Sequence, residues 1–290
     1  MTGYGYICIP NIILQKIFKT GFIYGIIRVI SILTLTKGTV MKTAIITGAS
    51  SGLGSEYFIA LTELCPEVEE FWLIARRESK LKELADKVPN VTSLVLPLDL
   101  TDNDSFTEYR NLLAEKNPEV VMLVNNAGYG KLGEAVKIPL KDQTDMVMLN
   151  CASLTAIALL TVPYMKKGSN IINVCSIAAF CPTPRMTVYS STKAYILSFS
   201  LGLRNELKER GINVLAVCPG PMDTEFMAVA GIEGRSRLFS LLPRCKTSEV
   251  VRISIIKAKK GRAVYTNRFI YKLYRVLTKL LPHSLTMRRL

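Results

Sequence analysis

Short apolar runs alternate with longer amphipathic segments along most of the chain. The apolar runs are rich in Val, Ile and Leu and are too short for core helices, so they predict strands. These strands are expected at residues 42–48, 70–76, 91–99, 119–128, 169–176 and 212–220. The segments between them have helical periodicity, and they predict helices at residues 51–64, 79–88, 104–116, 140–165 and 188–211.

The predicted strands are apolar on both faces, and Trp72 in the middle of one of them is expected in the core. Strands of this kind belong to a parallel sheet that helices cover on each side. With right-handed crossovers, the pattern predicts a single doubly wound α/β domain of the Rossmann type over residues 41–266. Its ligand is expected at the carboxyl ends of the strands.

Beyond this domain, the tail at residues 267–290 contains a predicted basic amphipathic helix that ends at Pro282. Its basic positions recur with helical spacing at Arg268, Lys272, Arg275 and Lys279. Its apolar positions are Phe269, Ile270, Leu273, Val276, Leu277, Leu280 and Leu281. Two interpretations stay open: the helix packs on the body or on a sister subunit, or it lies on anionic lipid.

Residues 1–40 are apolar and basic, and they contain no acidic residue. Lys16, Lys19 and Arg28 interrupt the apolar run, so no charge-free stretch reaches the roughly 18–20 residues of a membrane span. A small-residue cleavage site of the signal-peptide kind is also missing. The segment is interpreted either as a surface anchor or as residues upstream of a true start at Met41.

The net charge of +14 is concentrated at the two ends of the chain. Residues 1–40 carry +4 and residues 252–290 carry +11, which leaves −1 for residues 41–251. A nucleic-acid-binding domain would carry its basic surface on the body. The charge distribution therefore predicts no nucleic-acid partner. It also indicates that the two basic ends of the chain have a function of their own.

The seven cysteines form no C-x-x-C pair, and the only histidine is His283. Scattered cysteines in odd number suggest neither a disulfide framework nor a zinc site, so no metal is expected and a reducing cytoplasm fits best. With a single histidine near the end of the chain, Ser-His-Asp and Cys-His chemistry have nothing to be built from. If the protein is an enzyme, a side chain other than histidine must transfer the proton of the reaction.

The first predicted strand runs into the sequence "TGASSGLG" at residues 47–54. Gly48 permits a tight turn, Gly52 lets the backbone approach a pyrophosphate, and Gly54 lets the helix pack closely on the strand. The helix N-terminus then offers unpaired N–H groups to the anion. In this strand–turn–helix context the pattern indicates a dinucleotide site.

Further motifs follow in order: "NNAG" at 125–128, Ser176 at the end of a strand, Tyr189 four residues before Lys193, and "PGPMDT" at 219–224. Together with the glycine turn, they resemble the short-chain dehydrogenases/reductases over residues 41–265. The resemblance implies a catalytic group of Asn150, Ser176, Tyr189 and Lys193. Asn150 would shape its helix and hold a proton-relay water.

Tyr189 and Lys193 share one helix face at i and i+4. A tyrosine normally titrates near ~10, and an adjacent ammonium together with an oxidised nicotinamide is expected to lower that pKa. Tyr189 would then exchange a proton with the substrate oxygen, and Ser176 would hydrogen-bond the same oxygen. Lys193 would also hold the nicotinamide ribose, and the cofactor would carry the hydride.

The cofactor is expected to be NADP(H). An NAD enzyme places an acid about 20 residues beyond the glycine turn, whereas this chain has Ala75, Arg76 and Arg77 there. Arg76 is predicted to bind the 2′-phosphate, and Arg77 to be a solvated residue at a helix start. The full set of cofactor residues predicted from the glycine turn and the resemblance is Gly48, Ser50, Ser51, Gly52, Leu53, Gly54, Arg76, Asp99, Leu100, Asn126, Ala127, Gly128, Tyr189, Lys193, Pro219, Gly220 and Thr224, with Asp99 on the adenine.

The segment after residue 220 sets the substrate in this family. Here it is apolar, with Met222, Phe226, Met227, Leu238, Phe239, Leu241 and Leu242. These residues predict either a lid over a lipophilic ketone or alcohol (a steroid, a bile acid or a long-chain keto compound) or a subunit interface. A broad-specificity carbonyl or sugar-alcohol dehydrogenase and a non-catalytic NADP-binding module for a membrane or a partner stay open. The resemblance further suggests a homodimer or homotetramer, and the basic tail suggests peripheral contact with the inner face of a membrane.

Overall fold

The computed structural model describes residues 40–231, 242–282, 285 and 287. The chain divides into two compact units, Met1–Val40 and Met41–Leu290, and the features below belong to the second. Residues 1–39 of the predicted N-terminal extension, and His283, lie outside the described residues. So do Leu238, Phe239 and Leu241 of the predicted lid.

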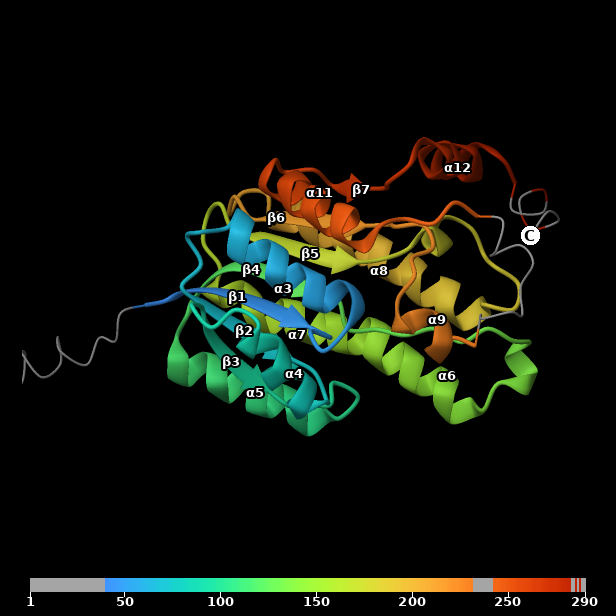
Figure 1. Cartoon of the computed structure of the whole chain (residues 1–290). Coiled ribbons are helices and arrows are strands. Elements are labelled where there is room, and N and C mark those ends of the chain that lie inside the picture. The colour runs from blue at the N-terminus through green and yellow to red at the C-terminus, as the bar shows by residue number, and fades with distance from the viewer. Residues whose placement is uncertain (1–39, 232–241, 283–284, 286, 288–290) are drawn as a thin grey trace, which may run out of the picture. The chain divides into compact units, whose positions relative to one another are not determined.

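The described residues form one seven-stranded sheet in the order β3-β2-β1-β4-β5-β6-β7, and every neighbouring pair is parallel (Figure 1). The strands are β1 Lys42–Thr47, β2 Glu70–Ile74, β3 Thr92–Leu96, β4 Glu119–Asn125, β5 Asn170–Val174, β6 Asn213–Val217 and β7 Val264–Tyr265. The order reverses between β1 and β4. This arrangement confirms the predicted doubly wound α/β fold.

Helices connect the strands. They are α3 Gly52–Leu64, α4 Glu78–Asp86, α5 Asn103–Lys116, α6 Leu140–Val147, α7 Leu154–Thr161, α8 Thr187–Glu206, α9 Glu225–Val229, α11 Thr247–Lys259 and α12 Phe269–Leu280. Shorter 3₁₀ turns occur at Ala135–Lys137, Val162–Tyr164 and Ile177–Phe180. Helix α12 is the basic amphipathic helix that the tail sequence predicts.

The hydrophobic core lies on both faces of the sheet, because successive strand side chains point in opposite directions. Leu73 belongs to a cluster that includes Phe58 of α3 and Val251 of α11, and α4 also packs there. Its neighbour Trp72, fully buried as predicted, packs on the other face with residues of α5, α7 and α8, such as Ile157. Burial on both faces explains why the strand sequences read as continuous apolar runs.

The helix predicted at 140–165 is present but not uniform. A π-helical turn, Met148–Ser153, joins α6 to α7. By length and composition alone the run Leu140–Tyr164 could cross a membrane. However, Ile157 and Ala158 are fully buried against the sheet, as is normal for a core helix.

Between residues 221 and 267 the sequence predicts no regular element, whereas the structure contains α9, α11 and β7. Strand β7 has only two residues, which pair with Ala216 and Val217 of β6. So short a strand carries no periodicity that a sequence pattern could reveal. Helix α11 packs beside α3 over the sheet (Figure 1).

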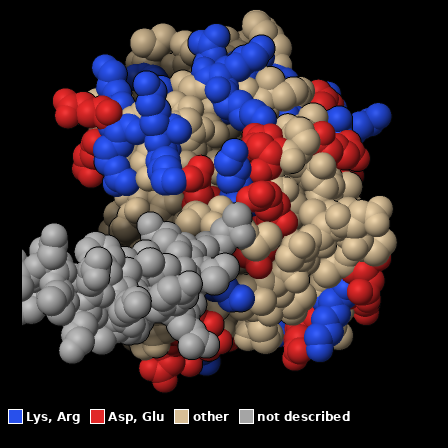
Figure 2. All heavy atoms as spheres, turned by 90° about the vertical axis from the view of Figure 1, so that its left-hand side faces the viewer, with Lys and Arg blue, Asp and Glu red and all other residues tan. Residues whose placement is uncertain are grey.

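Ion pairs neutralise part of the positive charge that follows residue 251. On α11, Arg252 pairs with Glu63, and Lys259 Nζ lies 3.0 Å from Glu67 Oε1. On the face presented in Figure 2, Lys and Arg side chains gather over the upper part, with acidic side chains along their edges and below them. That the protein has no nucleic-acid partner stays a prediction from the charge distribution along the sequence.

A buried hydrogen bond between α5 and α7 is expected to contribute measurably to stability. The Tyr109 hydroxyl lies 2.6 Å from Thr161 Oγ1, and Thr161 donates its own proton to the Ile157 carbonyl. Tyr109 must therefore be the donor. Tyr109→Phe should lower the free energy of unfolding by about 1 kcal/mol in urea denaturation, because one buried acceptor loses a partner.

The matched control is Tyr195→Phe. It also removes a Tyr–Thr hydrogen bond to α7, from Tyr195 to Thr155 at 2.8 Å, but this bond is exposed. Its removal should change the free energy of unfolding by less than about 0.5 kcal/mol. Equal losses for the two variants would contradict the role assigned to burial.

Candidate active site

The glycine turn between β1 and α3 is tightly packed. Gly48 has φ +65° and Gly52 has φ +55°, a region that favours glycine. A Cβ at Gly48 would lie 2.9 Å from the Ala127 backbone, and one at Gly54 would lie 2.1 Å from the Gly48 carbonyl oxygen. A side chain at either position would collide with this backbone, and α3 could not begin so close to β1. The turn therefore fits an anion at a helix N-terminus, as the sequence predicts.

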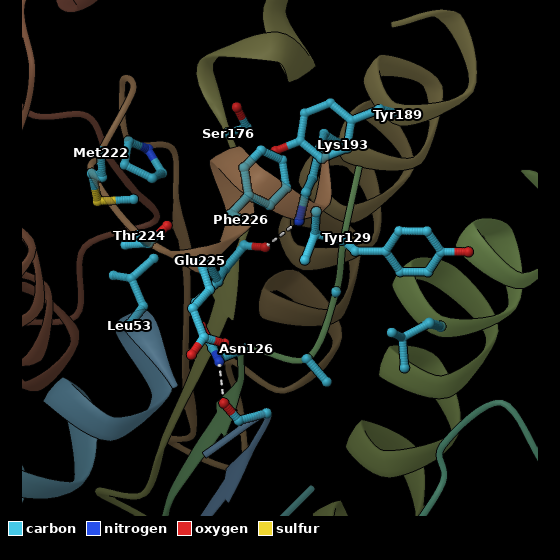
Figure 3. A pocket seen from close by; sticks show the side chains of 18 of the residues that line it. Leu53, Asn126, Tyr129, Ser176, Tyr189, Lys193, Met222, Thr224, Glu225 and Phe226 are labelled. Carbon is cyan, nitrogen blue, oxygen red and sulfur yellow. Dashed lines mark hydrogen bonds between the residues drawn. The ribbon is translucent and has the colours of Figure 1, made fainter. Parts of the chain in front are cut away.

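The end of β4 is fastened to this turn by hydrogen bonds. The backbone N–H groups of Asn126 and Ala127 donate to Thr47 Oγ1 at 3.0 and 3.1 Å. The Asn126 side-chain amide donates to the carbonyls of Thr47 and Gly48, both at 3.1 Å. Four hydrogen bonds therefore join the two strand ends at the reversal point of the sheet, and Figure 3 shows one that the Asn126 side chain makes.

The end of β2 brings two arginines to the same region. The Arg76 side chain is largely exposed, with Nη1 3.9 Å from Asp99 Oδ2. Partial burial acts to raise the pKa of Asp99, but hydrogen bonds from Thr101 and the charge of Arg76 outweigh it and lower the pKa. Asp99 is therefore a carboxylate that faces the cavity.

Arg77 lies at the start of α4 with its side chain 47% exposed, as the sequence predicts, but it also has partners that the sequence does not indicate. Its guanidinium donates to Ser50 Oγ in the glycine turn and lies 2.9 Å from Glu225 Oε2 on α9. Glu225 is 148 residues away along the chain, so no local pattern could reveal this pair. Arg77 thus connects the turn to the segment that the sequence proposes as a lid.

Asn150 lies in the π-helical turn and is fully buried. Its Oδ1 accepts from the Tyr129 backbone N–H at 3.0 Å, and its Nδ2 donates to the Tyr129 carbonyl at 2.9 Å. The same amide nitrogen donates to Thr192 Oγ1 at 3.0 Å. Asn150 therefore ties the loop after β4 to α8. It does not line the cavity itself.

Ser176, Tyr189 and Lys193 come together at the carboxyl ends of the strands (Figure 3). Ser176 follows β5, and its Oγ accepts from the Ala178 N–H at 3.1 Å. Tyr189 and Lys193 lie in α8, and Lys193 Nζ stands 5.6 Å from the centre of the Tyr189 ring. The Lys193 ammonium donates to the Val174 carbonyl at 3.0 Å.

The environment of these groups changes their titration. Burial raises the pKa of the Tyr189 phenol, while the Ser176 hydroxyl acts to lower it. Burial lowers the pKa of Lys193. In the protein without cofactor, desolvation outweighs the Ser176 hydrogen bond and raises the pKa. The lower pKa expected for Tyr189 depends on an oxidised nicotinamide beside the phenol, and it stays a prediction for the cofactor-bound protein.

A single cavity of about 810 Å³ connects these parts. Of the predicted site residues, those that line it are Gly48, Ser50, Ser51, Gly52, Leu53, Arg76, Asp99, Leu100, Asn126, Ala127, Gly128, Ser176, Tyr189, Lys193, Pro219, Gly220 and Thr224. Gly54 and Asn150 do not line it; they pack behind the turn and behind Gly128. The glycine turn and the Tyr-Lys pair thus open into the same space.

The rest of the cavity wall is mostly apolar. The described lid residues Met222, Phe226, Met227 and Leu242 all line it. Phe226 packs on Tyr189, with ring centres 5.4 Å apart.

Other lining residues were not predicted from the sequence. Tyr129, whose hydroxyl donates to the Asp142 carbonyl at 2.6 Å, belongs to the cavity, as do Ile270, Tyr271 and Tyr274 of the tail helix. Tyr129 directly follows the "NNAG" motif, which is the one signal that could have indicated it.

Within the described residues, no group of three His, Cys, Asp or Glu side chains gathers to hold a metal ion.

Comparison with known proteins adds the family. The model of the short chain dehydrogenase family matches residues 42–232. A very-long-chain 3-oxoacyl-CoA reductase of Phaeosphaeria nodorum is 31% identical over 187 residues, 60% of this chain. The match spans 53% of that fungal protein.

Two solved structures are similar over most of this chain. One is a short-chain dehydrogenase from Sphingobium yanoikuyae in complex with NADPH, with 28% identity, a TM-score of 0.72, and coverage of 83% of this chain and 93% of that chain. The other is the bulky-bulky ketone specific alcohol dehydrogenase from Comamonas testosteroni, with 28% identity, a TM-score of 0.66, and coverage of 83% and 92%. Since the family model matches more than half of the chain, this protein belongs to the short-chain dehydrogenase family of nicotinamide-dependent oxidoreductases.

Proposed function

We propose that this protein is an NADP(H)-dependent oxidoreductase that interconverts a ketone and a secondary alcohol on a hydrophobic substrate. One observation carries the proposal: Ser176, Tyr189 and Lys193 line the same cavity as the glycine turn. A group that can give or take a proton therefore opens into the space where a dinucleotide would be held.

The residues around the glycine turn fit the cofactor. The close contacts at Gly48 and Gly54 leave backbone N–H groups at the start of α3 for a pyrophosphate. Arg76 would bind a 2′-phosphate, Asp99 would contact the adenine, and Lys193 would hold the nicotinamide ribose. When bound, the cofactor supplies or accepts the hydride.

Tyr189 is the proposed proton donor and acceptor. Because burial raises its pKa, the phenol is protonated at neutral pH, which is the form that ketone reduction requires. Ser176 would hydrogen-bond the substrate oxygen and hold it near the phenol. Lys193, buried beside Tyr189, would stabilise the phenolate left after proton transfer.

A hydrophobic substrate is proposed from the cavity wall. Met222, Phe226, Met227 and Leu242 form an apolar region next to Tyr189. The names of two similar proteins agree with a large apolar substrate, namely a very-long-chain 3-oxoacyl-CoA reductase and a bulky-bulky ketone specific alcohol dehydrogenase. A steroid, a bile acid or a long-chain keto compound belongs to this class.

The proposal extends to location and assembly. Burial of the six described cysteines fits a reducing cytoplasm. A homodimer or homotetramer through the long helices is supported by apolar side chains exposed on α7 and α8, such as Leu159 and Leu201.

A panel of ketones graded by size and polarity tests the substrate class. In an NADPH-oxidation assay, kcat/KM should be highest for bulky apolar ketones, because the cavity buries apolar surface. Turnover of sugars or small polar keto acids alone would contradict the proposal. Shallow, unselective activity would instead support a broad-specificity carbonyl or sugar-alcohol dehydrogenase.

Tyr189→Phe tests the role of the phenol. The variant lacks the proton donor, so kcat should fall by at least about 100-fold, while NADPH binding measured by calorimetry stays unchanged. The matched control is Tyr195→Phe on the same helix, whose exposed hydroxyl bonds Thr155; its kcat should stay at the wild-type value. Unchanged turnover in Tyr189→Phe, or none in the wild type, would favour a non-catalytic NADP-binding module.

Arg76→Ala tests the cofactor preference. The wild type should use NADPH better than NADH, and the variant should lose about 10- to 100-fold in kcat/KM for NADPH with little change for NADH, because charge-assisted hydrogen bonds to the 2′-phosphate are lost. Arg77→Ala is the comparison: Glu225 already neutralises Arg77, so a smaller loss is expected. Equal use of both cofactors by the wild type would refute the preference.

A further inference from the structure

Helix α12 is held on the body by one face only. The Tyr271 side chain is 2% exposed, and its hydroxyl donates to the Pro243 carbonyl at 2.8 Å. Thr278 is buried, and the Tyr274 ring lies 6.3 Å from the ring of Phe180. Positions 271, 274 and 278 recur with helical spacing, so they form one inward face.

The opposite face of α12 is apolar and exposed. Its side chains are Phe269, Ile270, Leu273, Val276, Leu277 and Leu280, followed by Leu281. Phe269 is 79% exposed and Leu280 74% exposed. The helix therefore packs on its own body through the inward face, and a sister subunit or anionic lipid stays open for the exposed apolar face.

A row of cations flanks the exposed face. Arg268, Lys272 and Lys279 are exposed, and none of them takes part in an ion pair among the described residues. At about 100° per residue, these positions lie between the inward face and the apolar face. The sequence from residue 250 onward contains no acidic residue. In this the row differs from Arg252 and Lys259 of α11, which pair with acids on α3 and in the following turn.

We propose that α12 docks the protein on an anionic phospholipid surface. The apolar face would enter the boundary between headgroups and acyl chains, and the flanking cations would contact the lipid phosphates. A second copy is a poorer occupant, because a two-fold contact places the same patch of both copies together. The cations of each helix would then meet a helix that has no acidic side chain to pair with them.

Docking would also place one end of the cavity at the lipid. Ile270, on the exposed side of α12, lines the cavity together with Tyr271 and Tyr274. An apolar ketone could then pass from the bilayer to Tyr189 without crossing water. This extension rests on the proposed function, whereas docking itself does not.

The test places a fluorescent reporter on α12 of the full-length protein. The only native tryptophan, Trp72, is fully buried and gives a constant background. In Phe269→Trp, vesicles with equal parts of phosphatidylcholine and brominated phosphatidylglycerol should quench the new tryptophan. The control Val136→Trp, at a position 92% exposed on another part of the surface, should not be quenched.

Substitutions then separate the electrostatic contribution to vesicle binding from the apolar contribution. Binding is measured by vesicle co-sedimentation. Lys272→Gln with Lys279→Gln should weaken binding about 25-fold, about fivefold for each charge. Phe269→Gln with Leu280→Gln should weaken it about 100-fold. The matched pair Val136→Gln with Leu140→Gln, also highly exposed and apolar, should leave binding unchanged.

Several results would overturn the proposal. One is binding of the full chain without quenching of the Phe269→Trp reporter, which would assign the binding to another segment. Another is equal affinity for vesicles of phosphatidylcholine alone. A third is a dimer that dissociates in Phe269→Gln with Leu280→Gln while no vesicle is bound. All of these measurements are made without substrate or cofactor, so they stand apart from any failure of the proposed function.

Discussion

The side chain of Asn150 forms three hydrogen bonds that join the loop after β4 to helix α8. Because this amide is fully buried, no water could replace a lost partner, and each bond is costly to break. A Cβ at Gly128 would lie 2.8 Å from Asn150 Oδ1 and 3.7 Å from Lys193 Nζ. The amide therefore sets the distance between the end of β4 and the Tyr-Lys pair on α8. Since the end of β4 is hydrogen-bonded to the glycine turn, the position of that turn is set as well.

The π-helical turn Met148–Ser153 is what brings this amide inward. A π turn inserts one extra residue into a helix, and such turns often occur at functional sites. Here the extra residue lets α6 and α7 keep separate packing: Met146 of α6 packs in a cluster with Tyr189, while Ile157 of α7 packs under the sheet. Asn150 between them faces neither cluster and bonds across to Tyr129 and Thr192.

The strands β1 to β6 could be predicted because burial on both faces leaves a continuous apolar run. Most of the predicted site residues line the cavity because they stand in ordered motifs after those strands. The features that could not be predicted depend on residues that are far apart in the sequence and meet only in the fold. Arg77 meets Glu225 only in the folded protein, and the pKa of Tyr189 follows from its burial. Periodicity located an apolar face on α12, but it could not show that Tyr271 turns inward while Leu280 stays exposed.

The contact between Tyr271 and Gly220 has a consequence for how the chain can be altered. A Cβ at Gly220 would lie 2.2 Å from the Tyr271 ring. Glycine at position 220 is therefore needed for the packing of the tail helix, and not only for ligand binding. The last helix thus covers the turn that follows β6 and shields it from solvent. Shortening the chain before Phe269 would preserve every sequence motif of the family and still leave that turn open to water.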